Sequence, residues 1–360
     1  MKSNQKQINY LVSLFALIAV VFFSCKKDKD NTNASPETEY GFISGRVHTP
    51  NNTNVGSALI IAGEYNTKSN AQGEFILRVP TGFYKLKIQT GSGHVFKSMV
   101  GVEVKANDTL RLSDSESLLQ QIKQLAFIPG AYDRIETIII DSLGYAATAI
   151  SVNDLDNLSY MQSFGGIFFD CGKSGSLDSL KYTNISNYLV NGGSIYASDW
   201  AIEYLTGDGS WRPALGSNTL NVSASKNQSH EAGYSTMATC LSSEVGGFIP
   251  DSALCASKSG AIGLITNALI NDPDIVTLVG KDSMDIEYNL GSWEKISHVD
   301  IPFTTMIEKN NPGPGPLAVS CDLNGTAFGG RIIYTTFHNH PQGNISTDVK
   351  LVLQHFILSL

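Results

Sequence analysis

Short apolar runs alternate with segments of helical periodicity between residues 124 and 198. The apolar runs are QLAFI, ATAISV, GIFF and SIYAS, and each has the length of a strand. After the first run, Ile135, Ile138 and Ile139 recur at helical spacing, and Gly144 is placed to end that helix. This alternation predicts an α/β fold in which a largely parallel sheet has helices on both faces. Ligands of such a sheet bind beyond the carboxyl ends of its strands.

Later segments predict further elements of the same region. Residues 263–271 predict a helix, and residues 275–280, with the sequence IVTLVG, predict a strand. Residues 346–360 predict a terminal helix, because Ser-Thr-Asp precedes apolar residues at helical spacing. We therefore assign residues 120–360 to one α/β domain.

Residues 39–115 show a different pattern, with short runs of alternating apolar and polar residues. Turn signals such as PNNTN, NAQG, PTG and GSG separate these runs. The pattern predicts a small antiparallel β-sandwich, so the chain as a whole is expected to be multi-domain.

The order of residues in this segment resembles the carboxypeptidase regulatory-like domain. In that family a Gly ends a turn before a Phe-led strand, and a Pro-x-Gly-x-Tyr sequence follows. The matching residues are Gly73, Phe75, Pro80, Gly82 and Tyr84. The resemblance implies a spacer or binding module, without a catalytic role.

The first 38 residues indicate processing and tethering. Lys2 and Lys6 precede the apolar run 11–23, which is too short to span a bilayer comfortably. The sequence FFSC at its end resembles the lipobox of bacterial lipoproteins. The resemblance implies cleavage of residues 1–24 as a signal peptide and lipidation of Cys25, with an uncleaved signal anchor as the alternative.

Residues 25–38 are polar and predict a flexible tether. Their start, CKKDKD, resembles the tethers of surface-displayed lipoproteins. We therefore expect an outer-membrane lipoprotein of the cell envelope that is held to the membrane by the lipid. The CKKDKD segment either indicates display on the cell surface or is a plain solvated linker.

Composition excludes one class of partner and leaves the cysteines open. The net charge is −8, and loss of the two lysines of the signal peptide would bring it near −10, so no nucleic acid partner is expected. Beyond Cys25 the chain has four cysteines, which allow three pairings. Cys240 and Cys255 form the favoured disulfide, whereas Cys171 and Cys321 fit buried thiols.

Residues 120–360 resemble the class I glutamine amidotransferase-like fold, whose sheet is flavodoxin-like. The matching segments are GIFFDCG, YLVNGG, SIYASDWA and RIIYTTFHNHPQ. Asp199 stands where that family has its nucleophilic Cys, and His338 stands at the family's His. The family's Pro-Glu is replaced by Asn339 and His340. The resemblance therefore implies a domain that has lost glutamine hydrolysis.

Asp199 has several interpretations. A carboxylate at a strand-to-helix turn can simply cap the helix. It can also bind a ligand together with Ser198, His338 and His340, or act as a nucleophile or base. With His338 and Asp170 it can bind a divalent metal. The favoured expectation is nevertheless a domain without a cofactor.

The aromatic residues Tyr132, Trp200, Trp211 and Trp293 either line a sugar-binding face or belong to the core. The sequence thus favours a non-catalytic domain that binds a glycan, a peptide or a partner. The alternative is a hydrolase that uses Asp199 and His338, with or without a metal.

Overall fold

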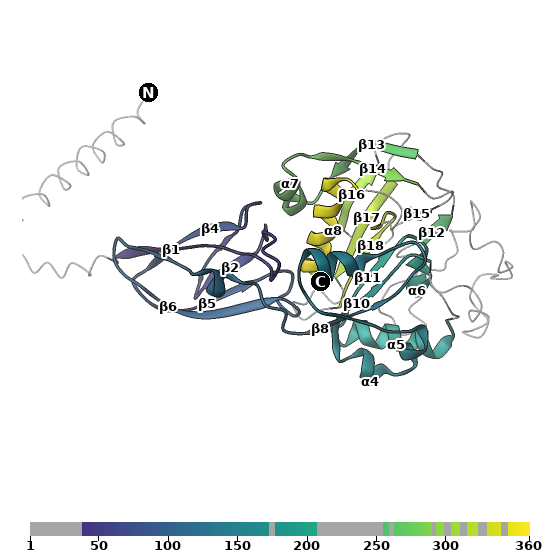
Figure 1. Cartoon of the computed structure of the whole chain (residues 1–360), viewed down its shortest axis with the longest axis horizontal. Helices are drawn as coiled ribbons and strands as arrows, with labels where there is room; N and C mark the ends of the chain where they lie inside the picture. The colour runs from purple at the N-terminus through teal and green to yellow at the C-terminus, as the bar shows by residue number, and fades with distance from the viewer. Residues whose placement is uncertain are drawn as a thin grey trace, which may run out of the picture. The chain divides into compact units, whose positions relative to one another are not determined.

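A computed structural model describes residues 38–172, 177–206, 255–258, 263–289, 293–298, 304–309, 315–322, 330–339 and 345–360 (Figure 1). Cys25, Trp211, Cys240 and His340 lie outside these described residues, so the predicted lipidation and disulfide do too. Residues Glu39–Leu360 form one compact unit. No helix among the described residues is long and apolar enough to cross a membrane.

Seven strands of the N-terminal region form two sheets. The first has the order β4-β1-β7, and the second has the order β3-β2-β5-β6. On β4 the side chains alternate between exposed and buried, so that Phe75, Leu77 and Val79 point into the core, as the period-two pattern predicts. The bounds are β1 (Tyr40–Arg46), β2 (Leu59–Ala62), β3 (Tyr65–Lys68), β4 (Glu74–Pro80), β5 (Gly82–Gln89), β6 (Lys97–Val104) and β7 (Thr109–Arg111), followed by the short helix α2 (Asp114–Ser117).

The prediction of a wholly antiparallel arrangement is wrong at one pair. β1 pairs in parallel with β7, with Phe42 opposite Thr109. The antiparallel partner of β1 is β4, which occupies its other edge. The turn before β7 is fixed to β1 by two backbone hydrogen bonds, from Asn107 N to Tyr40 O and from Phe42 N to Asp108 O. The chain therefore returns to this sheet as β7, which runs parallel to β1.

Five parallel strands form one half of a nine-stranded sheet. They lie in the order β9-β8-β10-β11-β18, which is 2-1-3-4-5 in chain order and matches the flavodoxin-like order. Ligands of that topology bind where the strand order reverses, beside the first and third strands. These strands are β8 (Gln124–Ile128), β9 (Ala147–Ala149), β10 (Phe164–Phe169), β11 (Ser194–Ser198) and β18 (Arg331–Thr335).

The other half of the sheet is antiparallel, so the sheet is mixed and the prediction of a largely parallel one is wrong for this half. β17 pairs antiparallel with β18, and β16, β13 and β14 follow with alternating direction. No described helix separates β16, β17 and β18 along the chain, so they are not joined by the helical crossovers typical of parallel neighbours. These strands are β13 (Gly263–Ile270), β14 (Ser283–Tyr288), β16 (Thr304–Lys309) and β17 (Gly315–Asp322); β12 (Cys255–Lys258) and β15 (Glu294–His298) form a separate pair.

Two predicted elements exchange their types. Residues 263–271 were expected to be helical but form β13, and residues 275–280 belong mainly to the helix α7 (Pro273–Val279). Asp272 caps this helix by accepting hydrogen bonds from Asp274 N and Ile275 N, and Gly280 ends it in a left-handed conformation. Short apolar runs do not by themselves distinguish helix from strand, so the β-branched residues of this segment misled the prediction. The caps at its two ends favour the helix.

Helices cover both faces of the sheet, as predicted. On β10, Phe168 packs in one core with α8 (Thr347–Ser359), while Ile167 and Phe169 pack in the other with α5 (Ser179–Val190). The remaining helical elements are α3 (Ile135–Thr137), the π-helix η1 (Ile138–Ser142), η2 (Val152–Asp156), α4 (Leu158–Met161), η3 (Asp199–Ile202) and α6 (Glu203–Thr206).

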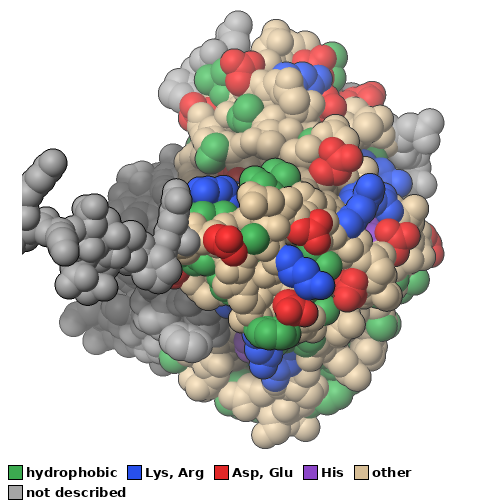
Figure 2. All heavy atoms as spheres, turned by 90° about the vertical axis from the view of Figure 1, so that its left-hand side faces the viewer, with side chains coloured by type: hydrophobic (Ala, Val, Ile, Leu, Met, Phe, Trp, Pro, Cys, Tyr) green, Lys and Arg blue, Asp and Glu red, His purple; other side chains and the backbone are tan. Residues whose placement is uncertain are grey.

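The face drawn in Figure 2 carries acidic and basic side chains in alternation rather than a broad basic area.

Candidate functional site

The loops after β8 and β10 meet at the point where the strand order reverses. Ala131 N donates to Gly172 O at 3.0 Å, and Tyr132 N donates to Cys171 O at 3.1 Å. A Cβ on Gly130 would lie 2.0 Å from Cys171 O, so only glycine allows this approach. These contacts place Cys171 beside the end of the next strand, β11.

Asp199 occupies the turn between β11 and η3 with a φ of +47°. A residue other than glycine in this left-handed region is uncommon, and an N-cap normally has extended backbone. The same strand-to-helix turn holds the nucleophile in hydrolases with a nucleophile elbow. The backbone therefore aims the Asp199 side chain differently from an ordinary cap.

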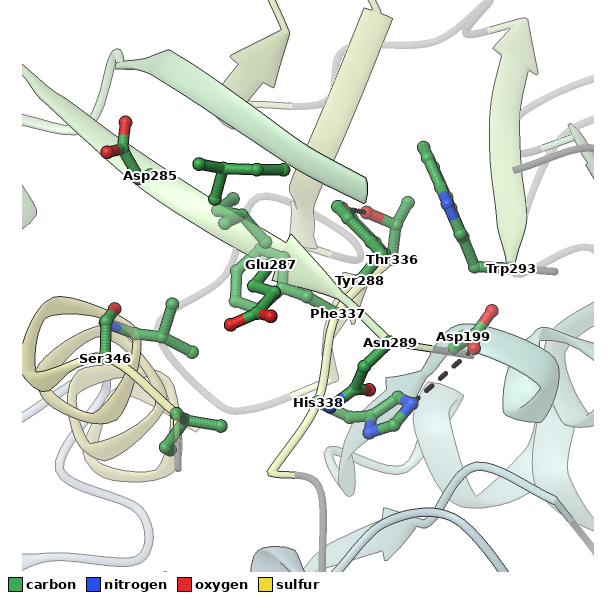
Figure 3. Close-up of a pocket in the computed structure, with 14 residues that line it drawn as sticks. Asp199, Asp285, Glu287, Tyr288, Asn289, Trp293, Thr336, Phe337, His338 and Ser346 are labelled. Carbon is green, nitrogen blue, oxygen red and sulfur yellow. Dashed lines mark hydrogen bonds and ion pairs between the residues drawn. The ribbon is translucent and has the colours of Figure 1, made fainter. Parts of the chain in front are cut away.

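Asp199 and His338 meet at the carboxyl ends of neighbouring strands. β11 and β18 pair in parallel with Ser198 opposite Thr335, so the residues that follow them lie at one edge. His338 Nε2 lies 3.6 Å from Asp199 Oδ2, and the ring points toward that carboxylate in Figure 3. Their side chains are only 7% and 1% exposed. The predicted convergence of these two residues is thus present in the structure.

The environment favours the protonated form of His338. Burial lowers the pKa of this imidazole, but the hydrogen bond to Asp199 and the charges of Asp133 and Asp199 outweigh burial and raise the pKa above its ordinary value. Asp199 and Asp133 therefore favour a positively charged imidazole at this place.

Cys171 is a third member that the sequence interpretation treated only as a buried thiol. Its Sγ lies 3.4 Å from Asp199 Oδ2, and the thiol donates to that oxygen. Burial, followed by the charge of Asp199, raises the pKa of Cys171 far above its ordinary value, so the apo site holds a thiol rather than a reactive thiolate. Donor atoms of Cys171, Asp199 and His338 all lie within 4.8 Å of one another. Its position directly after Asp170 at a strand end was the signal that could have indicated it.

Asp133 and Ser198 form a buried hydrogen-bonded support under the site. Ser198 Oγ donates to Asp133 Oδ2 at 2.5 Å and accepts from Cys171 N at 3.2 Å. Asp133 Oδ1 accepts from Asn339 N at 3.1 Å, which fixes the backbone next to His338. Burial raises the pKa of Asp133, partly offset by His338 and by the Ser198 hydrogen bond. Ser198 is therefore a positioning residue here, and Asp133 is a member that the sequence did not indicate.

Asp170 is not among the residues whose donor atoms gather with those of Asp199 and His338 in the described part of the chain. It is buried at the end of β10 but is not among the residues that line the cavity at that pair. Burial, then the charge of Asp133, raises the pKa of Asp170 well above its ordinary value. The metal-ligand set expected from sequence, with Asp170 as third member, thus has Cys171 in that place.

A cavity of about 180 Å³ opens beside Asp199 and His338. Its lining combines aromatic side chains with carboxylate, amide and hydroxyl groups. Trp293 stacks on Tyr288 with ring centres 4.1 Å apart, and Tyr288 Oη lies 2.7 Å from Thr336 Oγ1, which fixes this wall. Labelled lining residues in Figure 3 are Asp199, Asp285, Glu287, Tyr288, Asn289, Trp293, Thr336, Phe337, His338 and Ser346.

Tyr132 and Trp200 are not among the described residues that line this cavity, and Trp211 lies outside the described residues. Tyr132 and Trp200 pack edge to face with ring centres 5.3 Å apart, at the loops after β8 and β11. Of the four aromatic candidates, Trp293 is the one that the described residues place in the cavity wall.

Comparison with known proteins gives weak similarities only. No protein-family model matches the sequence, and no curated protein sequence matches it. The structure of a GMP synthase component from Thermoplasma acidophilum superposes with a TM-score of 0.39 and 10% identity, over 67% of this chain and 95% of that one. A ThuA-like protein from Bacteroides uniformis superposes with a TM-score of 0.40 and 10% identity, over 65% of this chain and 89% of that one.

Proposed function

We propose that the α/β domain binds a glycan in the cavity at Asp199 and His338. The observation that carries this proposal is the meeting of these two residues, 139 positions apart, at 3.6 Å in the wall of a cavity at the strand ends. A buried ion pair often contributes little net stability, because removing two charges from water is costly. The position of this pair in a cavity wall therefore favours a role in binding.

The lining of the cavity favours a neutral sugar over an anionic ligand. Asp285, Glu287 and Asn289 offer acceptor groups that suit sugar hydroxyls, and Trp293 and Phe337 offer aromatic surface. The two carboxylates would repel an acidic ligand. A peptide is the other ligand class. If the ligand is a peptide, the carboxylates of the lining would favour one with a basic side chain.

Calorimetry with a panel of neutral oligosaccharides, uronic-acid oligosaccharides and basic peptides tests this proposal on the full chain in detergent. We expect binding of neutral sugars, weakened about tenfold by Glu287→Gln through the loss of one charged acceptor. Glu103→Gln, a change at an exposed carboxylate on β6, is the matched control and should bind like the wild type. Binding of basic peptides alone, or equal binding by the Glu287 variant, would overturn the glycan proposal.

A hydrolase is the second candidate, favoured by the left-handed backbone at Asp199. In this reading the protonated His338 donates a proton to the leaving group, and Asp199 acts as nucleophile or base. Asp199→Asn should then abolish turnover of chromogenic glycosides or esters while ligand binding persists. Absence of turnover by the wild type on both substrate classes would remove this candidate.

We further propose that Cys25 carries a lipid that anchors the chain in the outer membrane, and that residues 39–115 act as a carboxypeptidase regulatory-like spacer. One contact and one backbone angle fit that motif: Tyr84 Oη donates to Pro80 O at 2.8 Å, and Gly73 has a φ of +78°. Cys25→Ala should move the chain out of the membrane fraction, and the mass of the wild type should include the lipid. Retention of the variant in membranes would favour an uncleaved anchor.

A further inference from the structure

We propose that Cys171, Asp199 and His338 bind a divalent transition-metal ion, with zinc as the best fit. These ligands follow β10, β11 and β18, three consecutive strands of the parallel half-sheet. The parallel register brings all three to one edge. This inference goes beyond ligand binding in the cavity and stands or falls separately from it.

Two distances within the cluster match those between zinc ligands. With Zn–S near 2.3 Å and Zn–N and Zn–O near 2.0–2.1 Å, tetrahedral geometry places neighbouring ligand atoms about 3.3–3.6 Å apart. Asp199 Oδ2 lies 3.4 Å from Cys171 Sγ and 3.6 Å from His338 Nε2. One carboxylate oxygen therefore stands at the right distance from both other donor atoms.

The donor types select among metals. A thiolate, an imidazole and a carboxylate suit zinc and neighbouring transition metals, whereas calcium and magnesium prefer oxygen ligands throughout. The thiolate and the carboxylate together carry two negative charges, which neutralise a divalent ion. The metal would therefore bring no net charge to this buried place.

Supporting contacts hold two of the ligands in position. The backbone N–H of Trp200 donates to the Cys171 sulfur, as expected for a ligated thiolate, and Ser198 Oγ accepts from Cys171 N at 3.2 Å. On the other side, Asn339 N donates to Asp133 Oδ1, which anchors the chain directly after His338. Cys171 and the backbone next to His338 thus have hydrogen bonds of the kind that hold metal ligands in position.

The fourth coordination position faces the cavity. Asp199 and His338 line it, whereas Cys171 lies behind them and is fully buried. Three protein ligands and one open position define a zinc site that takes a water or a ligand atom. A hydroxyl of a ligand bound in the cavity would supply that atom.

Metal analysis of the full chain, purified in detergent, treated with a chelator and reloaded with Zn²⁺ or Co²⁺, tests the proposal. We expect one tightly bound metal per chain and a thiolate-to-cobalt charge-transfer band in the near ultraviolet. Cys171→Ala should abolish that band, and each of Cys171→Ala, Asp199→Asn and His338→Gln should weaken zinc binding by more than about 100-fold, the upper range for loss of an outer-sphere partner alone.

Cys321→Ala is the matched control, because Cys321 is the other buried free cysteine among the described residues and lies on β17, outside the cluster. It should keep both the metal and the band. Circular dichroism establishes that each variant is folded, and His338→Gln provides a second test if Cys171→Ala unfolds. Less than one metal per wild-type chain, or a cobalt spectrum without the thiolate band, would overturn the proposal and leave a metal-free hydrogen-bonded network.

Discussion

Replacing Asp199 by Asn would remove the charge that faces His338 while keeping the shape of the side chain. Two unit charges 3.6 Å apart interact by about 4–5 kcal/mol at an effective dielectric constant of about 20. Removal of one partner from a buried ion pair costs about 3–5 kcal/mol. We therefore expect Asp199→Asn to lower the free energy of unfolding by about 3–5 kcal/mol at pH 5, where the imidazole is charged.

The loss should shrink as the pH rises. The pKa of His338 is raised in the folded wild type, so its stabilising contribution is complete below the unfolded pKa of about 6.5 and disappears as pH rises through the folded pKa. In the variant, the charge of Asp199 is gone, and Asp133 is left to oppose the lowering of the imidazole pKa by burial. Folding at acid pH then requires burial of a poorly compensated positive charge. The difference between the two proteins is therefore largest at pH 5 and smallest at pH 8.5.

Urea unfolding at pH 5, 7 and 8.5, with a chelator present, measures this difference. Asp348→Asn is the control, because Asp348 pairs with Lys281 at 2.5 Å on the surface, where both side chains are 25% or more exposed. That change should cost less than about 1 kcal/mol at each pH. An Asp199→Asn loss that is equal at pH 5 and pH 8.5, or no larger than the control, would refute the buried ion pair.

Three further changes test the supporting structure. Ser198→Ala should cost about 1–3 kcal/mol in urea unfolding, because the buried Asp133 loses its donor; unchanged stability would contradict that role. Gly73→Ala should cost roughly 1–3 kcal/mol or more, since its φ is +78° and the new Cβ would lie 2.3 Å from Val47 O; a wild-type melting temperature would show that the turn adapts. Asp170→Asn should raise the free energy of unfolding by on the order of 1–4 kcal/mol. The gain should grow as pH rises from about 4, because the raised pKa of Asp170 makes the folded wild type resist an ionisation that the unfolded chain undergoes. A lower free energy of unfolding for the variant at pH 8 would show that the folded protein uses the charge.

The sequence allowed prediction of the strand-to-helix alternation and of the residues at the strand ends. Asp199 was identified because it follows a short apolar run at a strand-to-helix turn and stands at the nucleophile position of the amidotransferase-like pattern. His338 was identified because it stands at the His of that pattern, and the carboxyl ends of parallel strands share an edge. Their side chains do meet at that edge. Local pattern was sufficient here because burial on both faces makes parallel strands continuous apolar runs.

The antiparallel half-sheet and two element types could not be predicted in the same way. Residues 263–271 and 275–280 are short and apolar, so periodicity alone does not separate strand from helix. The caps at Asp272 and Gly280 were the local signals that decide α7. Pairing direction depends on which strand edge is free, and this is a property of the assembled sheet.

Hydrophobic periodicity is local, so the residues at the strand ends could be identified from the chain without knowledge of their partners. The folded arrangement was needed to show that Cys171 rather than Asp170 joins Asp199 and His338. Successive side chains at a strand end point in different directions, so of the two buried neighbours Asp170 and Cys171 only Cys171 places its donor atom beside Asp199 and His338. The chemistry available to this site therefore depends on register and backbone direction, which no short stretch of sequence contains.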